Sequence, residues 1–414
     1  MQALTDANLA AHLPALLTVG VAVFLGLFAG KAVRRLRLPS IIGFMLVGLA
    51  LGPSLLGVID ANLQENLGFV TDIALSFVAI SIGLELSLSS IRKQGKGLAA
   101  IILTESFAAF IVVAVAIYFV TRNLPLALIF GALAPASAPA GTVAVIQEYK
   151  ARGPLTRTLY AVVGFDDGLG IIIFGFASAV AASIISATTG AEATDILHLI
   201  GEPILEILLS FGLGAAVAVV YCILTRKLEN PRDVMILTFG VVLATAGLSK
   251  LIGSSVILTN MVVGAVAVNT QPAAVIRKIR DRIAELLPLL FVLFFVLAGA
   301  NLHIAALPTL GVIGITYMAG RSAGLISGSW LGATMGKAEP TIRKYLGLGI
   351  LSQAGVAIGL ALSVKQEFAE LGPIGADVGN IVITTVTATS IIFEIVGPVL
   401  AKTGLRKAGE IRSD

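Results

Sequence analysis

The stretch Gly-Ala-Leu-Ala-Pro-Ala-Ser-Ala-Pro-Ala-Gly-Thr, residues 131–142, interrupts an apolar run that extends over residues 124–146. The run is long enough to cross a membrane, because a helix needs about 20 apolar residues to span a ~30 Å hydrocarbon core. Pro135 and Pro139 lie four residues apart within it. Each proline removes a backbone donor and clashes with the preceding helical turn. The sequence therefore predicts a membrane helix that is broken near its middle.

The composition is that of a protein embedded in a membrane. Of 414 residues, 57% are hydrophobic and only 13% are charged, and the mean hydropathy is +0.99. A water-soluble chain averages roughly 45–50% apolar and about 25% charged residues, so this chain has too little charge to coat a soluble surface. Cys222 is the only cysteine, which excludes a disulfide scaffold. The sequence predicts an all-α polytopic membrane protein.

Apolar runs of this kind recur along the whole chain. Thirteen candidate transmembrane helices cover residues 13–30, 41–56, 67–88, 97–120, 124–146, 159–185, 199–224, 234–251, 254–268, 283–300, 307–332, 345–362 and 378–400. The Lys and Arg residues check this count, because they gather in cytoplasmic loops. With thirteen spans, 24 of the 28 fall in the odd-numbered connections and the C-terminal tail.

This charge pattern predicts orientation and location. We expect a multi-pass protein of the plasma (inner) membrane, with its N-terminus outside and its C-terminus in the cytoplasm. The basic excess is then orientation charge facing membrane lipid, and no nucleic-acid partner is expected. Residues 1–414 are expected to form a single membrane domain with no soluble regulatory domain.

Two groups of three spans indicate an inverted repeat. They cover residues 97–185 and 307–400 and lie seven spans apart, so corresponding helices run in opposite directions. The middle span of the second group is interrupted by Gly347, Gly349, Gly355 and Gly359, around Ser352 and Gln353. Interrupted spans in corresponding positions of two inverted halves are typical of a transporter binding site. The alternative is a pair of ordinary kinks that pack through small residues.

Three charges lie at mid-membrane depth. Asp166 lies nine residues beyond Arg157, about 14 Å along a helix, and Asp167 follows it. Arg321 is equally deep, because it lies thirteen residues from Pro308 and sixteen from Lys337. An isolated charge at this depth costs at least ~2.5–3.5 kcal/mol, so charges of both signs at one depth predict a single site. A buried ion pair that only holds helices together accounts for one aspartate and Arg321, but not for the second aspartate.

Adjacent helical residues point about 100° apart, so one carboxylate is expected to face Arg321 and the other a wet cavity. A carboxylate in such a cavity can release a proton and hold a small cation in its place. Ser137 and Thr142, beside the first break, either supply oxygen ligands or satisfy freed backbone groups. Gln353, in the second break, is a further candidate for lining the ion site. The sequence also offers two weaker candidates, the acids Glu105 and Glu394, for lining a pathway.

These residues resemble the monovalent cation:proton antiporters. The closer branch is cation:proton antiporter family 2, which includes bacterial Na⁺/H⁺ antiporters and the glutathione-gated K⁺ efflux systems. The aspartate pair within Gly-Phe-Asp-Asp, residues 164–167, is the specific signal. Weaker stretches are Arg-Leu-Pro-Ser-Ile-Ile-Gly-Phe (37–44), Ile-Gly-Leu-Glu-Leu (82–86), Gln-Ala-Gly-Val-Ala-Ile-Gly (353–359) and Glu-Ile-Val-Gly-Pro (394–398).

The resemblance implies a transporter that is not an enzyme and needs no cofactor beyond the transported ions. It implies that Asp167 carries the ion and the proton, and that Asp166 pairs with Arg321, with both aspartates near the bound Na⁺. It places Ser137 and Thr142 where the family's broken helix lines the ion site. It also implies a homodimer in which the two groups of three spans form a core that moves against a dimerisation scaffold in an elevator fashion.

Two features separate the candidate activities. The paired basic residue is often Lys in related exchangers, and Arg321 cannot give up a proton as lysine can. Members that export K⁺ usually carry Gln at the first aspartate, whereas this chain has Asp166, so Na⁺ or Li⁺ is favoured. A K⁺/H⁺ antiporter of the same fold is the first alternative, and a sodium-coupled symporter of an organic anion is the second. An intramembrane aspartyl protease is disfavoured because its two aspartates come from facing helices, and a channel needs no titrating carboxylate.

Overall fold

The computed structural model describes residues 14–189, 196–302 and 311–411. The side chain of Asp167 and the first residues of the span predicted at 307–332 lie outside the described part. The first half of the chain forms α1 (Ala15–Arg35), α2 (Ser40–Leu51), α3 (Ala61–Asn66), α4 (Gly68–Glu85), α5 (Leu88–Thr121), α6 (Leu124–Leu133), α7 (Pro139–Glu148) and α8 (Pro154–Thr189). The second half forms α9 (Ile196–Arg226), α10 (Pro231–Ile252), α11 (Val256–Thr270), α12 (Ala273–Ala300), α13 (Gly311–Met335), α14 (Pro340–Gly349), α15 (Gly355–Ala369) and α16 (Pro373–Lys407).

Both predicted breaks are confirmed. The first broken helix stops at Leu133 and resumes at Pro139, where proline takes the first helical position and its missing N–H is not needed. The second stops at Gly349 and resumes at Gly355. Within the described residues, eight helices are each long and apolar enough to cross a membrane: α1, α4, α5, α8, α9, α10, α12 and α16. The all-helical membrane fold is thus confirmed, while thirteen crossings remain a prediction.

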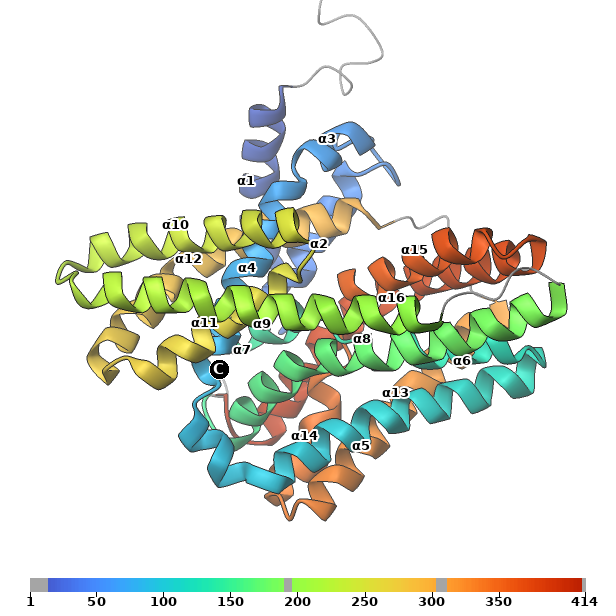
Figure 1. The fold of residues 1–414 in the computed structure, drawn as a ribbon. Coiled ribbons are helices and arrows are strands. Elements are labelled where there is room, and N and C mark those ends of the chain that lie inside the picture. Colours follow the sequence, from blue (N-terminus) through green and yellow to red (C-terminus); the bar gives the residue numbers. More distant parts are fainter. Residues whose placement is uncertain (1–13, 190–195, 303–310, 412–414) are drawn as a thin grey trace, which may run out of the picture.

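Helix packing follows the inverted repeat. If each helix is matched to the one seven predicted spans later, α1, α2, α4 and α5 correspond to α10, α11, α12 and α13. The packing of α2 on α12 then has its counterpart in α11 on α4, and the packing of α1 on α12 has its counterpart in α10 on α4. The pair α5 and α13 corresponds to itself, and these two helices run side by side (Figure 1).

A stripe of glycines brings α5 and α13 together. Gly324, Gly328 and Gly332 recur every fourth residue of α13 and therefore share one face of the helix. A Cβ atom on Gly328 would lie 2.6 Å from the Cα atom of Glu105, and one on Gly332 would lie 2.6 Å from that of Ile101. Because positions rise along α5 as they fall along α13, the two helices are antiparallel. Small residues at such a crossing let backbones approach closely in a membrane.

We expect Gly328→Ala to destabilise the protein. The added methyl group must push α13 away from the backbone of α5, and overpacking of this kind typically costs about 1–3 kcal/mol. Gly247→Ala is the matched control, because no atom lies within 4 Å of a Cβ atom at that helical position. Alanine there gains up to about 1 kcal/mol in helix propensity. Thermal unfolding in detergent should show a lower midpoint for the first variant only. Equal midpoints would contradict the close crossing.

The N-terminus of α8, the helix that carries the two aspartates, is held by the C-terminal segment. The carboxylate of Glu410 accepts hydrogen bonds from the backbone N–H groups of Leu155 and Thr156, at 2.6 and 2.7 Å. It also accepts one from the Thr156 hydroxyl, at 2.6 Å. The first N–H groups of a helix have no partner within the helix, and a carboxylate satisfies them well. Glu410 therefore fixes the start of α8.

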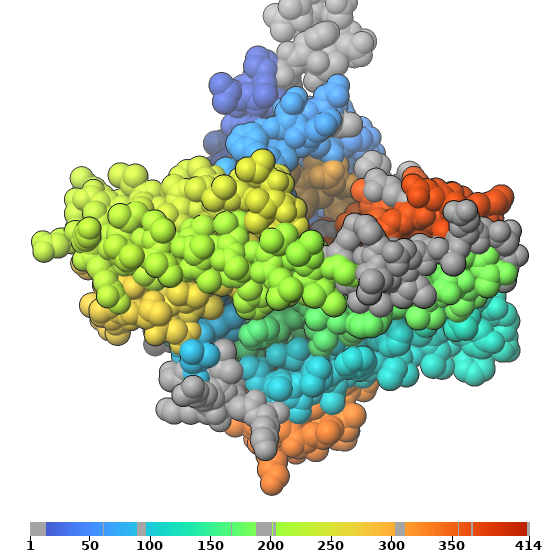
Figure 2. Space-filling model, viewed as in Figure 1, coloured from blue at the N-terminus to red at the C-terminus, as the bar shows by residue number. Residues whose placement is uncertain are grey.

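The outer surface carries many exposed apolar side chains. Helices α9 and α10 form a broad band across the face seen in Figure 2. Their exposed apolar residues include Ile204, Leu205, Leu208, Phe211, Val219, Val220, Ile223, Ile236, Leu243 and Leu251. A water-soluble monomer rarely exposes so large a contiguous apolar area. This surface is suited to contact with lipid, as expected of a multi-pass membrane protein.

Candidate functional site

The two helix breaks cross and bond to each other. The backbone N–H of Ala138 donates to the carbonyl of Ser352 at 2.8 Å, which joins the first break to the second. The hydroxyl of Thr142 donates to the carbonyl of Gly349 at 2.7 Å. Backbone groups inside a membrane must find partners within the protein, and these bonds supply some of them. Of the two roles expected for Thr142, the structure shows the satisfaction of a freed backbone group.

Arg321 supplies further donors to both breaks. Its guanidinium donates from Nε to the carbonyl of Ala134 at 2.9 Å and from Nη1 to that of Leu351 at 2.7 Å. Its Nη2 donates to the carbonyls of Ala136 and Ser352, at 3.0 and 3.4 Å. The side chain has no exposed surface. One arginine thus joins both breaks through four carbonyl oxygens.

The predicted direct pairing of Asp166 with Arg321 is not present in this conformation. Both side chains are described, both are fully buried, and they form no ion pair within 4.0 Å. Arg321 is nevertheless near enough to act on Asp166 electrostatically. Arg321 bonds to the breaks instead, because the carbonyl groups freed there need hydrogen-bond donors inside the membrane and the guanidinium carries five N–H donors. Its flat face also lies over the ring of Phe393, with Cζ 4.5 Å from the ring centre.

Gln353 is likewise engaged with the first break. Its amide nitrogen donates to the carbonyl of Leu133 at 3.0 Å, and its side-chain oxygen accepts a hydrogen bond from the Tyr317 hydroxyl at 3.1 Å. Both side chains are fully buried. Tyr317 and Phe393 were not among the residues predicted from the sequence. Tyr317 lies four residues before Arg321, hence on the same face of α13, and this spacing is a signal that could have found it.

Asp166 lies in an acidic, fully buried cluster. Its Oδ2 atom accepts a hydrogen bond from the Ser137 hydroxyl at 3.0 Å, so Ser137 of the first break does reach an aspartate. Glu105, on α5, interacts electrostatically with Asp166. Glu105 Oε1 accepts from the Ser106 hydroxyl at 2.8 Å. Neither carboxyl group has exposed surface.

The other predicted acids occupy different positions. Glu394 is half-buried on α16, and no hydrogen bond joins it to the cluster among the described side chains. Asp167 follows Asp166 in α8, and its side chain lies outside the described part of the structure. The described residues contain no group of three or more His, Cys, Asp or Glu side chains arranged to hold a resident metal ion.

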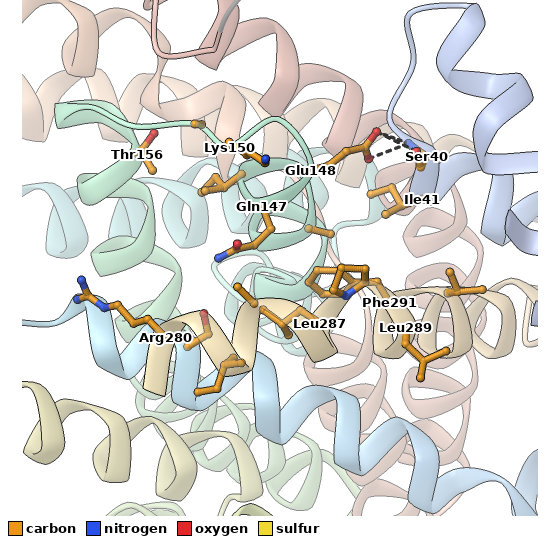
Figure 3. Close-up of a pocket in the computed structure, with 18 of the residues that line it drawn as sticks. Ser40, Ile41, Gln147, Glu148, Lys150, Thr156, Arg280, Leu287, Leu289 and Phe291 are labelled. Carbon is orange, nitrogen blue, oxygen red and sulfur yellow. Dashed lines mark hydrogen bonds between the residues drawn. The ribbon is translucent and has the colours of Figure 1, made fainter. Parts of the chain in front are cut away.

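A cavity of about 1220 Å³ opens beside α7 and α8. Helices α7 and α8 line one side of it, and α1, α2, α4 and α12 line the other (Figure 3). The lining residues of α8 are Thr156, Arg157 and Tyr160, all near its N-terminus. The exposed charged side chains of the lining are Lys31, Arg34, Lys150, Arg152, Arg157 and Asp281. The cations among them come from connections predicted to be cytoplasmic.

One carboxylate joins the two sides of this cavity. Glu148, at the end of α7, accepts hydrogen bonds from the backbone N–H and the hydroxyl of Ser40, at 2.9 and 2.8 Å (Figure 3). It thereby satisfies the N-terminus of α2. The Nε atom of Arg34 lies 3.5 Å from the same carboxylate. Outside the cavity lining, the Nζ atom of Lys402, on α16, donates to the carbonyl of Arg37, between α1 and α2, at 2.7 Å.

Broken helices that cross in an inverted repeat, with buried carboxyl groups beside the crossing, define a secondary transporter of small ions. The chain belongs to the sodium/hydrogen exchanger family, whose transmembrane family model matches residues 20–402. The expected resemblance to cation:proton antiporters is thereby confirmed, and this is a family of transporters rather than enzymes.

Solved structures share the fold. Two structures of the sodium proton antiporter MjNhaP1 from Methanocaldococcus jannaschii superpose with TM-scores of 0.72 and 0.68, each at 20% identity. The first covers 97% of this chain and 99% of that one, and the second, determined at pH 8, covers 95% and 98%. In sequence, Na(+)/H(+) antiporter 1 of the same organism is 26% identical over 158 residues. That match spans 37% of this chain and 37% of the relative's length.

Proposed function

We propose that the protein is a secondary antiporter that exchanges Na⁺, or Li⁺, for protons. Membership of the sodium/hydrogen exchanger family supports this activity, and both similar proteins of Methanocaldococcus jannaschii are named for sodium and protons. The buried carboxyl groups at the crossing of two broken helices give the exchange a chemical basis. A carboxylate binds either a proton or a small cation, and this competition couples the two fluxes.

Asp167 is the proposed carrier of both ions. It lies seven residues after Tyr160. Seven residues fall only about 20° short of two full helical turns, so both positions share one face of α8. Tyr160 lines the large cavity, and Asp167 lies about 10 Å further along the helix axis. Asp166 lies on a different face and is already engaged by Ser137. The proposal rests on the position of Asp167, which lies on the same face of α8 as the cavity-lining Tyr160 and two turns further along the helix.

Alternating access is proposed to move α5–α8 and α13–α16 together as an elevator core against the remaining helices. The cavity between α7–α8 and α1, α2, α4 and α12 supports this division, because it lies along the boundary between the two parts. Glu148 and Lys402 cross this boundary, and their bonds to Ser40 and Arg37 would break as the core moves.

The orientation, assembly and location follow the sequence expectations. Positive side chains gather around the cavity, which supports a cytoplasmic opening under the positive-inside rule. We propose a plasma-membrane protein with its N-terminus outside that works as a homodimer. Its exposed apolar faces fit lipid and a second copy of the chain.

Proteoliposomes that contain a pH dye test the activity. With an outward gradient of Na⁺ or Li⁺, we expect the lumen to acidify, because each cation that leaves brings protons in. The apparent KM for Na⁺ should rise as the pH falls, since protons compete for Asp167, while saturating Na⁺ restores the rate.

Three outcomes would contradict the proposal. Alkalinisation as Na⁺ leaves has the wrong sign for exchange and indicates a sodium-coupled symporter. Acidification with K⁺ alone assigns the protein to the potassium alternative. A KM for Na⁺ that does not change with pH would refute competition between proton and cation for one carboxylate.

A further inference from the structure

The first turn of α8 is capped from a distant part of the chain. Ordinarily the residue before a helix accepts a hydrogen bond from the second or third N–H group of the helix through its own side chain. Here that residue is Gly153, which has no side chain, and the helix begins with Pro154, which has no N–H. The N–H groups of Leu155 and Thr156 donate instead to the carboxylate of Glu410, which lies 255 and 254 residues further along the chain. The start of α8 is therefore set by the C-terminal segment rather than by its own loop.

The glycine at position 153 leaves room for this carboxylate. A Cβ atom there would lie 2.2 Å from Cδ of Glu410 and 2.3 Å from its Oε1 atom. Carbon atoms that are not bonded prefer a separation of about 3.5–4.0 Å, so any side chain at this position would push the carboxylate away from the N–H groups. Gly153 and Glu410 therefore act as a matched pair.

The segment that carries Glu410 is held on both sides. Gly409 has a φ of +76°, in the left-handed region that glycine adopts readily, and this turns the chain back where α16 ends at Lys407. The N–H of Glu410 then donates to the carbonyl of Leu405 at 3.0 Å. Its own carbonyl accepts a hydrogen bond from the N–H of Arg152 at 3.1 Å. The glutamate is thus bonded to the end of α16 and to the loop between α7 and α8.

The helix capped in this way holds the candidate ion ligands. Asp166 and Asp167 follow Thr156 by ten and eleven residues, roughly 15 Å along the helix axis. Each turn of a helix is bonded to the next, so a shift or rotation of the first turn also moves these positions. On α16, at the other end of the link, the ring of Phe393 lies against the guanidinium of Arg321. The cap therefore sets the position of α8 relative to the helix that supports the crossing of the two breaks.

We propose that Glu410 is a positioning residue for ion exchange, which sets the axial position of α8 and with it the affinity for Na⁺. This role rests on the proposed exchange, in which Asp167 carries Na⁺. A hard cation is held by several oxygen ligands, whereas a proton needs only one oxygen. Such a site has to be held within roughly 0.5 Å of its productive geometry. A displaced α8 therefore weakens Na⁺ binding more than proton binding, and Glu410 contributes to the KM for Na⁺ rather than to the maximal rate.

The proteoliposome assay of Glu410→Ala tests this role. We expect the apparent KM for Na⁺ to rise by about three- to tenfold and the maximal rate to stay within about twofold, since a 1 Å misplacement by a distant residue can cost up to roughly 100-fold. Glu410→Gln keeps one acceptor oxygen and should give an intermediate KM. Glu339→Ala is the matched control and should leave the KM unchanged. Glu339 is exposed and also precedes a helix that begins with proline, but its side chain makes no capping hydrogen bond.

Gly153→Ala tests the same contact from the other side. It leaves Glu410 in the chain but expels the carboxylate, so it should raise the KM for Na⁺ to the same degree as Glu410→Ala. Because both changes remove one and the same interaction, the variant that combines them should be no worse than either alone. Effects of the two changes that simply add would overturn the proposal.

Hydrogen exchange of the full-length protein, followed by mass spectrometry, examines the cap without transport. The amides of Leu155 and Thr156 should exchange faster in Glu410→Ala than in the native protein or in Glu339→Ala. The proposal is overturned if these amides exchange faster while the KM for Na⁺ is unchanged, because the cap is then only structural. It is also overturned if the maximal rate falls and the KM does not rise. A native protein without Na⁺-coupled proton flux would refute the proposed exchange, and with it this role, while the faster amide exchange would still establish the cap.

Discussion

Asp167→Asn should reduce Na⁺-dependent proton flux to that of liposomes without protein. Asparagine has nearly the shape of aspartate, but it neither ionises nor binds a proton in the accessible pH range. Both halves of the proposed cycle need the carboxylate, one to hold Na⁺ and the other to carry the proton back. The variant should therefore lose exchange completely in a pH-dye assay, while remaining folded.

A second assay separates loss of binding from loss of folding. Na⁺ that binds only the folded protein raises its unfolding temperature through mass action. This Na⁺-dependent increase should disappear in Asp167→Asn and persist in Asp377→Asn, which makes the same chemical change at an exposed position of α16. If Asp167→Asn still exchanged Na⁺ for protons, another residue would carry the ions and the proposed role of Asp167 would fail.

The arrangement of the helices could be predicted from the sequence because membranes impose strong rules. Apolar length gives the spans, and Pro135, Pro139 and the glycines around Ser352 give the breaks. The glycine stripe of α13 was not used, although its four-residue spacing is visible in the sequence. The stripe allows another helix to lie close against α13, but spacing alone does not say that the partner is α5.

The contacts of the site could be predicted less well. Depth in the membrane brought Asp166 and Arg321 to one region, as expected, and opposite charge then favoured a direct pair. In the structure, the guanidinium of Arg321 instead donates hydrogen bonds to the carbonyls of Ala134, Ala136, Leu351 and Ser352. Every residue has a backbone carbonyl, so the sequence does not show which carbonyls lack a donor. That becomes evident only when the two breaks are seen side by side.

Arg321→Lys is expected to lower exchange at least tenfold and to lower the unfolding temperature strongly, although it preserves the charge. Lysine has three donors on one nitrogen and cannot reach four carbonyls on two separate breaks, whereas the planar guanidinium does so. Each buried carbonyl left without a donor costs about 1–3 kcal/mol. The carbonyls of Ser352 and Ala136 keep donors from Ala138 and Gln353, so the loss falls mainly on those of Ala134 and Leu351. Two such losses cost roughly 2–6 kcal/mol, a large part of the roughly 5–15 kcal/mol that typically separates folded from unfolded protein.

The lysine variant also distinguishes the two roles considered for this residue. If Arg321 acted chiefly as a counter-charge to Asp166, lysine would serve nearly as well, and exchange and stability would both persist. If it acts by joining the breaks, both fall together, and Arg321→Ala is worse still because it removes every donor to the breaks together with the buried positive charge. Arg282→Lys is the control, since its pairing with Glu285 at 2.7 Å lies on a partly exposed face of α12 and contributes little. Full exchange in Arg321→Lys would show that the residue acts only through its positive charge. Its hydrogen bonds to the two breaks would then not be needed for stability.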